Sequence, residues 1–101
     1  MKMAQALVSV QILPHTPNGE SVIPYVDRAI EIIQQAGVPY RVGPLETTME
    51  GELPELLAII ERMNEAMIEM GCPSVLHQVK IYFNPAGASI RGLTGKYDEK
   101  Q

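Results

Sequence analysis

Apolar residues repeat with two different periods along this 101-residue chain, and the order of the periods limits the folds that it can adopt. Residues 5–13, QALVSVQIL, alternate as in a strand, and one of their two faces is fully apolar. Residues 22–36 repeat at helical spacing, which predicts a helix from an N-cap at Ser21 to a stop at Gly37. The chain therefore opens with a strand followed by a helix.

The second half of the chain repeats this alternation. It predicts two short strands, residues 38–42 and 46–51, joined by a Gly-Pro turn. A helix with a methionine-rich apolar stripe follows at residues 54–70, and the last strand spans residues 75–83. Two right-handed crossovers joined by a hairpin give a ferredoxin-like α+β sandwich with βαββαβ order. We expect a four-stranded antiparallel sheet with the first strand central and two helices on one face. The core predicted between sheet and helices consists of Ala6, Val8, Val10, Ile12, Ile30, Ile33, Ile60, Met63, Met67, Val79 and Ile81. This domain spans residues 1–85, and residues 86–101 form a partly mobile tail.

Composition excludes several classes of partner. A formal net charge of −4 argues against a nucleic-acid surface, which is normally basic. No apolar stretch approaches the roughly 20 residues that span a bilayer, and the N-terminal run alternates as a strand does, so we expect neither a membrane partner nor a signal peptide. The lone cysteine, Cys72, gives neither a disulfide nor a metal cluster. We expect a cytoplasmic protein without a metal.

The helices cover one face of the sheet, and the other face has a mixed character. Strand parity assigns to this open face Leu7, Ser9, Gln11, Leu13, Thr48, Glu50, Leu76, Gln78, Lys80 and Tyr82. Its apolar members favour contact with the sheet of another subunit, and its polar members then need partners, which a small polar ligand would supply. The alternative is a solvated sheet face on which Glu50 and Lys80 form an incidental pair.

The residues carry no catalytic signature. No nucleophile–base pair or paired acid stands out, so we expect a binding module and not an enzyme. RNA binding, metal transfer and acylphosphatase activity, all found on this fold, need stacking aromatic residues, paired cysteines or a loop arginine that the first strand and its loop lack. His15 and His77 have no third ligand at metal spacing. Arg91 and Lys96 are assigned to the tail.

Three segments carry a resemblance to a known family. They are VSVQILP in the first strand, the run from AIEIIQQAG through GPLETTMEGE, and HQVKIYF in the last strand. The most distinctive piece is the Gly-Pro turn followed by Thr47, two residues and Glu50-Gly51. Over residues 6–84 the chain resembles the thiamine-binding, YkoF-like proteins, short chains long classed as of unknown function.

The resemblance implies a ferredoxin-like fold, self-association through sheets into dimers and tetramers, and binding of thiamine or its hydroxymethyl-pyrimidine part. Between the two assemblies we expect a homotetramer built as a dimer of dimers. It implies no catalysis and no cofactor. Thr47 and Glu50 match the family motif, and strand parity adds Ser9, Gln11, Thr48 and Lys80 as ligand-binding residues. The alternative function is a structural or regulatory module whose open face recognises another protein.

Two further expectations concern this site. Thr47 and Glu50 are three residues apart, so they share a face only if the strand begins after Thr47 or a bulge re-aims it. The aminopyrimidine presents a donor beside an acceptor, and the cationic thiazolium suits Glu50. A diphosphate ester needs several basic groups, and parity supplies only Lys80. Free thiamine or its pyrimidine is therefore the expected ligand.

Overall fold

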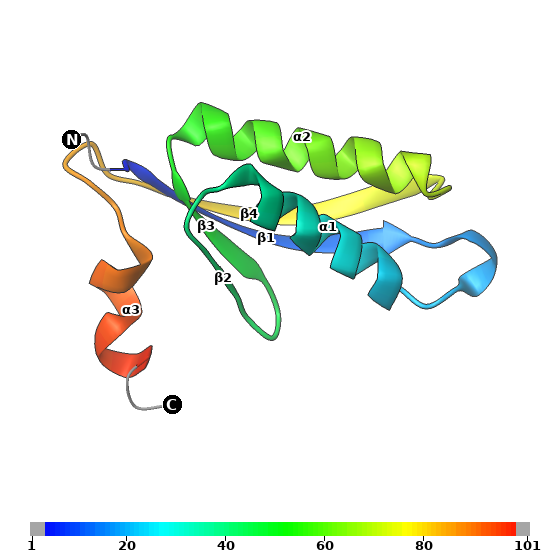
Figure 1. Cartoon of the computed structure of the whole chain (residues 1–101), viewed down its shortest axis with the longest axis horizontal. Coiled ribbons are helices and arrows are strands. Elements are labelled where there is room, and N and C mark those ends of the chain that lie inside the picture. Colours follow the sequence, from blue (N-terminus) through cyan, green and yellow to red (C-terminus); the bar gives the residue numbers. More distant parts are fainter. Residues whose placement is uncertain (1–3, 99–101) are drawn as a thin grey trace.

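The computed structural model describes residues 4–98 and has the predicted order of strands and helices, with two additions (Figure 1). The strands are β1 (Ala6–His15), β2 (Tyr40–Val42), β3 (Thr47–Gly51) and β4 (Ser74–Phe83). The helices are α1 (Ile23–Ala36), α2 (Leu53–Glu69) and α3 (Ile90–Asp98), and the loop after β1 contains a short 3-10 turn, Pro17–Gly19. The additions are this turn and α3. The ferredoxin-like α+β prediction is confirmed.

The four strands form one antiparallel sheet in the order β2-β3-β1-β4, so the first strand is central, as predicted. β4 pairs with β1 over its whole length, from Ala6–Phe83 to His15–Ser74. β3 pairs with β1 only from Ala6–Gly51 to Val10–Thr47. Beyond Val10 the central strand therefore has a neighbouring strand on one side only.

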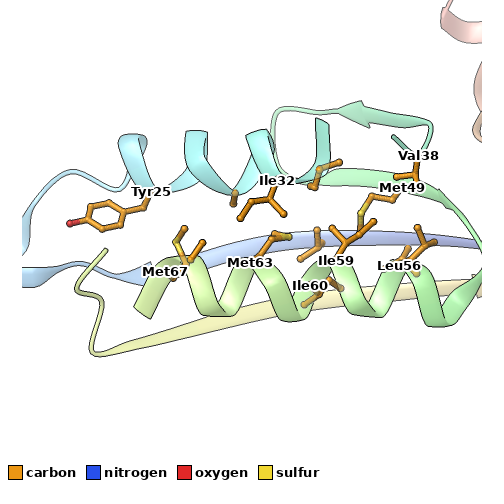
Figure 2. Packing of buried hydrophobic residues seen from close by; sticks show 14 of the residues in the cluster. Tyr25, Ile32, Val38, Met49, Leu56, Ile59, Ile60, Met63 and Met67 are labelled. Carbon is orange, nitrogen blue, oxygen red and sulfur yellow. The ribbon is translucent and has the colours of Figure 1, made fainter. Parts of the chain in front are cut away.

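Helices α1 and α2 pack on one face of the sheet and enclose the core (Figure 1). On the apolar face of β1, Ala6, Val8 and Val10 are buried there, as the alternation predicts, and Ile12 is partly buried. Figure 2 shows Met63 and Met67 of α2 directed toward Ile32 and Tyr25 of α1, and both methionines are buried. Flexible methionine side chains fill the irregular space between two helices and a twisted sheet.

Three residues predicted for this core lie at its margin. Val79 is 40% exposed, Ile81 is 50% exposed, and Ile30 is only half-buried. The side chains of Val79 and Ile81 point to the helix side of the sheet as predicted, but β4 is an edge strand and the helix layer leaves its outer residues uncovered. The prediction that Val79 and Ile81 are core residues is therefore wrong.

The helix α3 lies where the sequence predicted only a tail. Ser89 accepts a hydrogen bond from the Gly92 amide at 2.8 Å, as an N-cap residue does. The Ile90 amide donates to Glu50 Oε1 at 2.8 Å, and Arg41 Nη1 donates to Thr94 Oγ1 at 2.8 Å. Because Glu50 and Arg41 belong to the open face of β3 and β2, α3 lies against part of the sheet face that α1 and α2 leave free. The mobility of the tail stays a prediction.

Across residues 4–98, none of the helices combines the length and the apolar character that crossing a bilayer requires.

Candidate functional site

Five of the six predicted ligand-binding residues lie on the open face. The regular register of β1 with β3 and β4 places there Ser9, Gln11, Thr48, Glu50 and Lys80. Ser9 is the centre of this group, because it pairs with Thr48 on one side and with Lys80 on the other. Three polar side chains from three strands therefore lie in one row across the sheet.

The hydroxyl of Ser9 is a buried polar group whose hydrogen-bonding capacity is not fully used. The residue is 9% exposed, and its Oγ makes no hydrogen bond of ordinary geometry within residues 4–98. It nevertheless lies close enough to Glu46 to affect that carboxyl. The pKa of Glu46 is below its ordinary value because the Ser9 hydroxyl, and after it the Lys80 ammonium group, stabilise the carboxylate. A buried hydroxyl in this state is an exception to the rule that such groups are hydrogen-bonded.

Glu46 also pairs with Lys80, whose Nζ lies 3.2 Å from Glu46 Oε1. The Lys80 side chain is 77% exposed, so this ion pair contributes little to stability and is easily exchanged for another partner. The incidental pair that we considered, Glu50 with Lys80, is not the pair that forms. Glu46 was missed as a site residue, although its parity with Thr48 and Glu50 in the predicted strand 46–51 already indicated the open face.

Beside this row lies a shallow cavity of about 330 Å³. Its lining residues are Arg41, Gly43, Pro44, Leu45, Glu46, Thr48 and Lys80. Arg41 was not predicted here, but it pairs with Thr48 across β2 and β3 and so faces the same side. The open face therefore carries two basic side chains, Arg41 and Lys80, and the prediction that Lys80 is its only basic group is wrong. Arg41 is held by Thr94 of α3, and Lys80 is held by Glu46.

Glu50 is on the open face as predicted, and in the structure its carboxylate holds α3. Its Oε1 accepts the amide hydrogen of Ile90, the first residue of that helix. A carboxylate at a helix N-terminus satisfies an amide that has no partner within the helix and interacts favourably with the helix dipole. The predicted role of Glu50 as a ligand group stays a prediction.

Thr47 is on the other side of β3. The strand begins at Thr47 and pairs regularly with β1, so neither the later start nor the bulge that we expected is present. Thr47 is 7% exposed and lines a cleft between α1 and the loop of the β2–β3 hairpin. Thr47, which matches the family motif, and its neighbour Thr48 therefore lie on opposite faces of the sheet.

The apolar residues of the open face differ in exposure. Leu7 is buried and shares a small cavity with Ile90 and Leu93 of α3. Leu13, Leu76 and Tyr82 are 40%, 60% and 45% exposed. The apolar area that we expected to contact another subunit is thus reduced by α3 at one end and remains exposed on β1 and β4.

Within residues 4–98, no group of three or more His, Cys, Asp or Glu side chains is placed to hold a metal ion.

The fold and this face define a small ferredoxin-like domain with polar groups at the centre of its open sheet face. Comparison with known proteins identifies the family. The model of the family described as "Thiamine-binding protein" matches residues 8–98, and the chain belongs to that family. The resemblance drawn from the sequence is thereby confirmed.

Individual relatives agree with this assignment. A UPF0045 protein from Clostridium perfringens (strain 13 / Type A) is 41% identical over 90 residues, which cover 89% of this chain and 94% of that protein. A domain of unknown function, DUF77, from Bacillus cereus has a similar structure, with a TM-score of 0.87, 37% identity and coverage of 96% and 93% of the two chains. A candidate thiamine biosynthesis/salvage protein from Thermotoga maritima has a TM-score of 0.82, with 29% identity and coverage of 92% and 98%.

Proposed function

We propose that this protein binds thiamine, or its hydroxymethyl-pyrimidine part, on the open sheet face at an interface between copies of the chain, without catalysing a reaction. The observation that carries the proposal is the Ser9 hydroxyl, which is buried, makes no hydrogen bond of ordinary geometry in residues 4–98 and lies between Thr48 and Lys80. Membership of the thiamine-binding family supports the choice of ligand. A bound ligand would supply the missing hydrogen bond.

The polar side chains in and beside this row suit an aminopyrimidine. Hydroxyl and amide groups both donate and accept hydrogen bonds, so Ser9, Gln11 and Thr48 can pair with the amino donor and the ring-nitrogen acceptor of the ligand. The carboxylates of Glu46 and Glu50 give the face a negative character that suits a thiazolium cation. One oxygen of Glu50 holds α3, and we assign its second oxygen to the ligand.

Assembly completes the proposed site. Leu13, Leu76 and Tyr82 leave apolar area exposed around the polar row. Residues of this kind bury readily against a second copy, and a symmetric contact would place the row in a water-excluded interface. We therefore propose a homotetramer, organised as a dimer of dimers, in the cytoplasm. Exclusion of water would also strengthen each hydrogen bond between the ligand and the row.

The exposed edge strand β4 supports a second candidate function. β4 is an edge strand of ten residues, and it exposes Val79, Ile81 and Phe83 on the helix side in addition to the open-face residues. Long apolar edge strands are sites where another chain adds to a sheet. A structural or regulatory protein-interaction module would use this edge and need no small molecule.

The experiment that separates the two candidates is a thermal-shift measurement with thiamine, hydroxymethyl-pyrimidine and thiamine diphosphate. A ligand at one hundred times its Kd stabilises the folded state by about 2.7 kcal/mol, which corresponds to a Tm increase of at least roughly 10 °C for a domain of this size. Thiamine or the pyrimidine should raise the Tm. No shift with any of the three compounds would favour the interaction module.

The Ser9→Ala variant tests the site itself. Removing the Ser9 hydroxyl should change the Tm of the free protein little, because its Oγ makes no hydrogen bond of ordinary geometry in residues 4–98 and only its weaker interaction with the Glu46 carboxylate is lost. The same substitution should reduce the thiamine-induced shift. Ser74→Ala, at the exposed start of β4, is the matched control and should keep the full shift. An undiminished shift in Ser9→Ala would remove Ser9 from the site.

A further inference from the structure

The helix α3 is attached to the sheet with little apolar packing. None of residues 90–97 is buried, and Leu93 and Tyr97 are 53% and 56% exposed. A cavity of about 230 Å³ remains between α3 and the open face. In Figure 1 the helix lies apart from α1 and α2. Segments with few buried apolar contacts open at a small cost in free energy, so α3 can leave the sheet while the rest of the fold stays intact.

Hydrogen bonds from the open face hold α3 in place. Glu50 Oε1 accepts the amide hydrogen of Ile90 at 2.8 Å, and Arg41 Nη1 donates to Thr94 Oγ1 at 2.8 Å. Arg41 and Thr48 line both the cavity under α3 and the neighbouring open-face cavity of about 330 Å³. The attachment of α3 and the proposed ligand site therefore use the same side chains.

The docked helix prepares these side chains for a cationic ligand. Its bond from Ile90 fixes the Glu50 carboxylate, and the second oxygen of that carboxylate is the one that the proposed function assigns to the ligand. The bond to Thr94 directs the guanidinium group of Arg41 toward α3. When α3 leaves, Arg41 loses this acceptor and competes with the ligand for Glu46, a carboxylate that lines the same cavity. Groups that are fixed before binding cost less to order when the ligand arrives.

We propose that docking of α3 is coupled to occupancy of the open-face site, so that thiamine binds more tightly when α3 is docked and bound thiamine holds α3 on the sheet. This coupling rests on the proposed function, because it names the element that regulates the same site. A ligand shifts an equilibrium between two states only through its different affinity for them. Here the difference comes from the fixed carboxylate of Glu50 and from the charge of Arg41, which α3 holds.

The coupling has one magnitude that two separate measurements share. If docking of α3 raises the affinity for thiamine by a certain factor, bound thiamine raises the docking equilibrium of α3 by the same factor. Typical coupling factors between two sites are about 5 to 150, and we expect a factor of at least about five here.

Hydrogen exchange of the full chain, read by NMR, measures the docking of α3. Saturating thiamine should slow exchange of the Ile90 amide and of the amides within α3 by at least about fivefold. The Glu20 amide, which donates to the Pro17 carbonyl at the far end of β1, is the control and should keep its rate.

Calorimetric titration of thiamine into two variants at Gly95 measures the binding. Gly95→Pro breaks α3 in its interior, and it should weaken binding by the same factor by which thiamine slows exchange in α3. Gly95→Ala is the matched control. Its Cβ would lie 3.2 Å from Cγ of the exposed Arg91, whose side chain can move, and alanine favours the helix. This variant should slow exchange in α3 of the free protein and keep the affinity of the parent.

The outcomes separate the coupling from the proposed function. If thiamine binds the parent and Ser9→Ala weakens that binding, the open-face site stands. Unchanged exchange in α3 with thiamine, or full affinity in Gly95→Pro, then overturns the coupling alone. If the parent does not bind thiamine, both are wrong. If Gly95→Pro does not fold, Thr94→Val replaces it, because it removes the acceptor of Arg41, and full affinity in that variant counts against the coupling in the same way.

Discussion

The carboxylate of Glu50 is expected to hold α3 against the sheet, and replacing it tests that role. It accepts the Ile90 amide at 2.8 Å, at the end of the helix where amides lack internal partners. A hydrogen bond to a charged group contributes about 1.5–3 kcal/mol, and we take the lower value because Glu50 is half-buried. Leu93 is 53% exposed, so apolar burial adds little to the attachment of α3.

The effect of Glu50→Ala should therefore be local. A loss of about 1.4 kcal/mol is a factor of ten in an equilibrium constant, so amides in α3 should exchange with solvent roughly tenfold faster. Amides of Val8 and Val10 in the buried central strand should keep their protection. Glu50→Gln retains an acceptor without the charge and should give a smaller acceleration. Glu61→Ala, at an exposed position of α2, is the control and should change neither region.

Hydrogen exchange read by NMR, with calorimetric titration of thiamine on the same variants, completes the experiment. Unchanged exchange in α3 would refute the reasoning, because the carboxylate would then not be holding the helix. Loss of protection in β1 would refute the claim that the effect is local. If Glu50 also contacts the ligand, Glu50→Ala should weaken thiamine binding roughly ten- to a hundredfold, and Glu50→Gln should weaken it less.

Three further predictions concern the pKa of His77, the pKa of Glu46 and the oligomeric state. Burial lowers the pKa of His77 below its ordinary value of 6.5. The folded protein therefore keeps its full stability above pH 6.5 and loses part of it as the pH falls from 6.5 through the pKa of His77 in the folded state. His77→Gln should remove this part of the pH dependence of the Tm. The Ser9 hydroxyl is the largest cause of the lowered pKa of Glu46, so this pKa, measured by NMR titration of the Glu46 carboxyl carbon, should rise in Ser9→Ala. An unchanged pKa would show that the Ser9 hydroxyl does not interact with the Glu46 carboxylate. Light scattering at micromolar concentration should give a tetramer, and a monomer would remove the interface from the proposed function.

Most of the fold could be predicted from the sequence because local signals agree with the tertiary arrangement. The alternation of β1 and the apolar stripe of α2 each match the face that the structure buries. The errors at Val79 and Ile81 have one cause. Alternation reports which face a side chain takes, but the cover over that face depends on whether the strand lies at the edge of the sheet.

The helix α3 could not be predicted from local signals. Gly92 and Gly95 lower its intrinsic helix propensity, and a Cβ at Gly92 would lie 2.6 Å from Ser89 Oγ, the atom that caps the helix. Its hydrogen bonds to the sheet are made with Glu50 and Arg41, which lie 40 and 53 residues earlier in the chain than their partners Ile90 and Thr94. A helix that depends on a distant carboxylate leaves little trace in its own sequence, so the role of Glu50 in holding it was also missed.

The length of the β2–β3 hairpin explains why one short stretch of sequence serves two cavities. β3 begins at Thr47, and the turn from Gly43 to Glu46 is closed by the hydrogen bond from the Gly43 amide to the Glu46 carbonyl at 2.9 Å. Two more residues in each arm would pair the central strand beyond Val10 and fill the cleft with backbone. The same extension would move Glu46 away from Ser9 and Lys80. A short hairpin thus leaves the edge of β1 free on one face of the sheet and keeps a carboxylate beside the buried hydroxyl on the other.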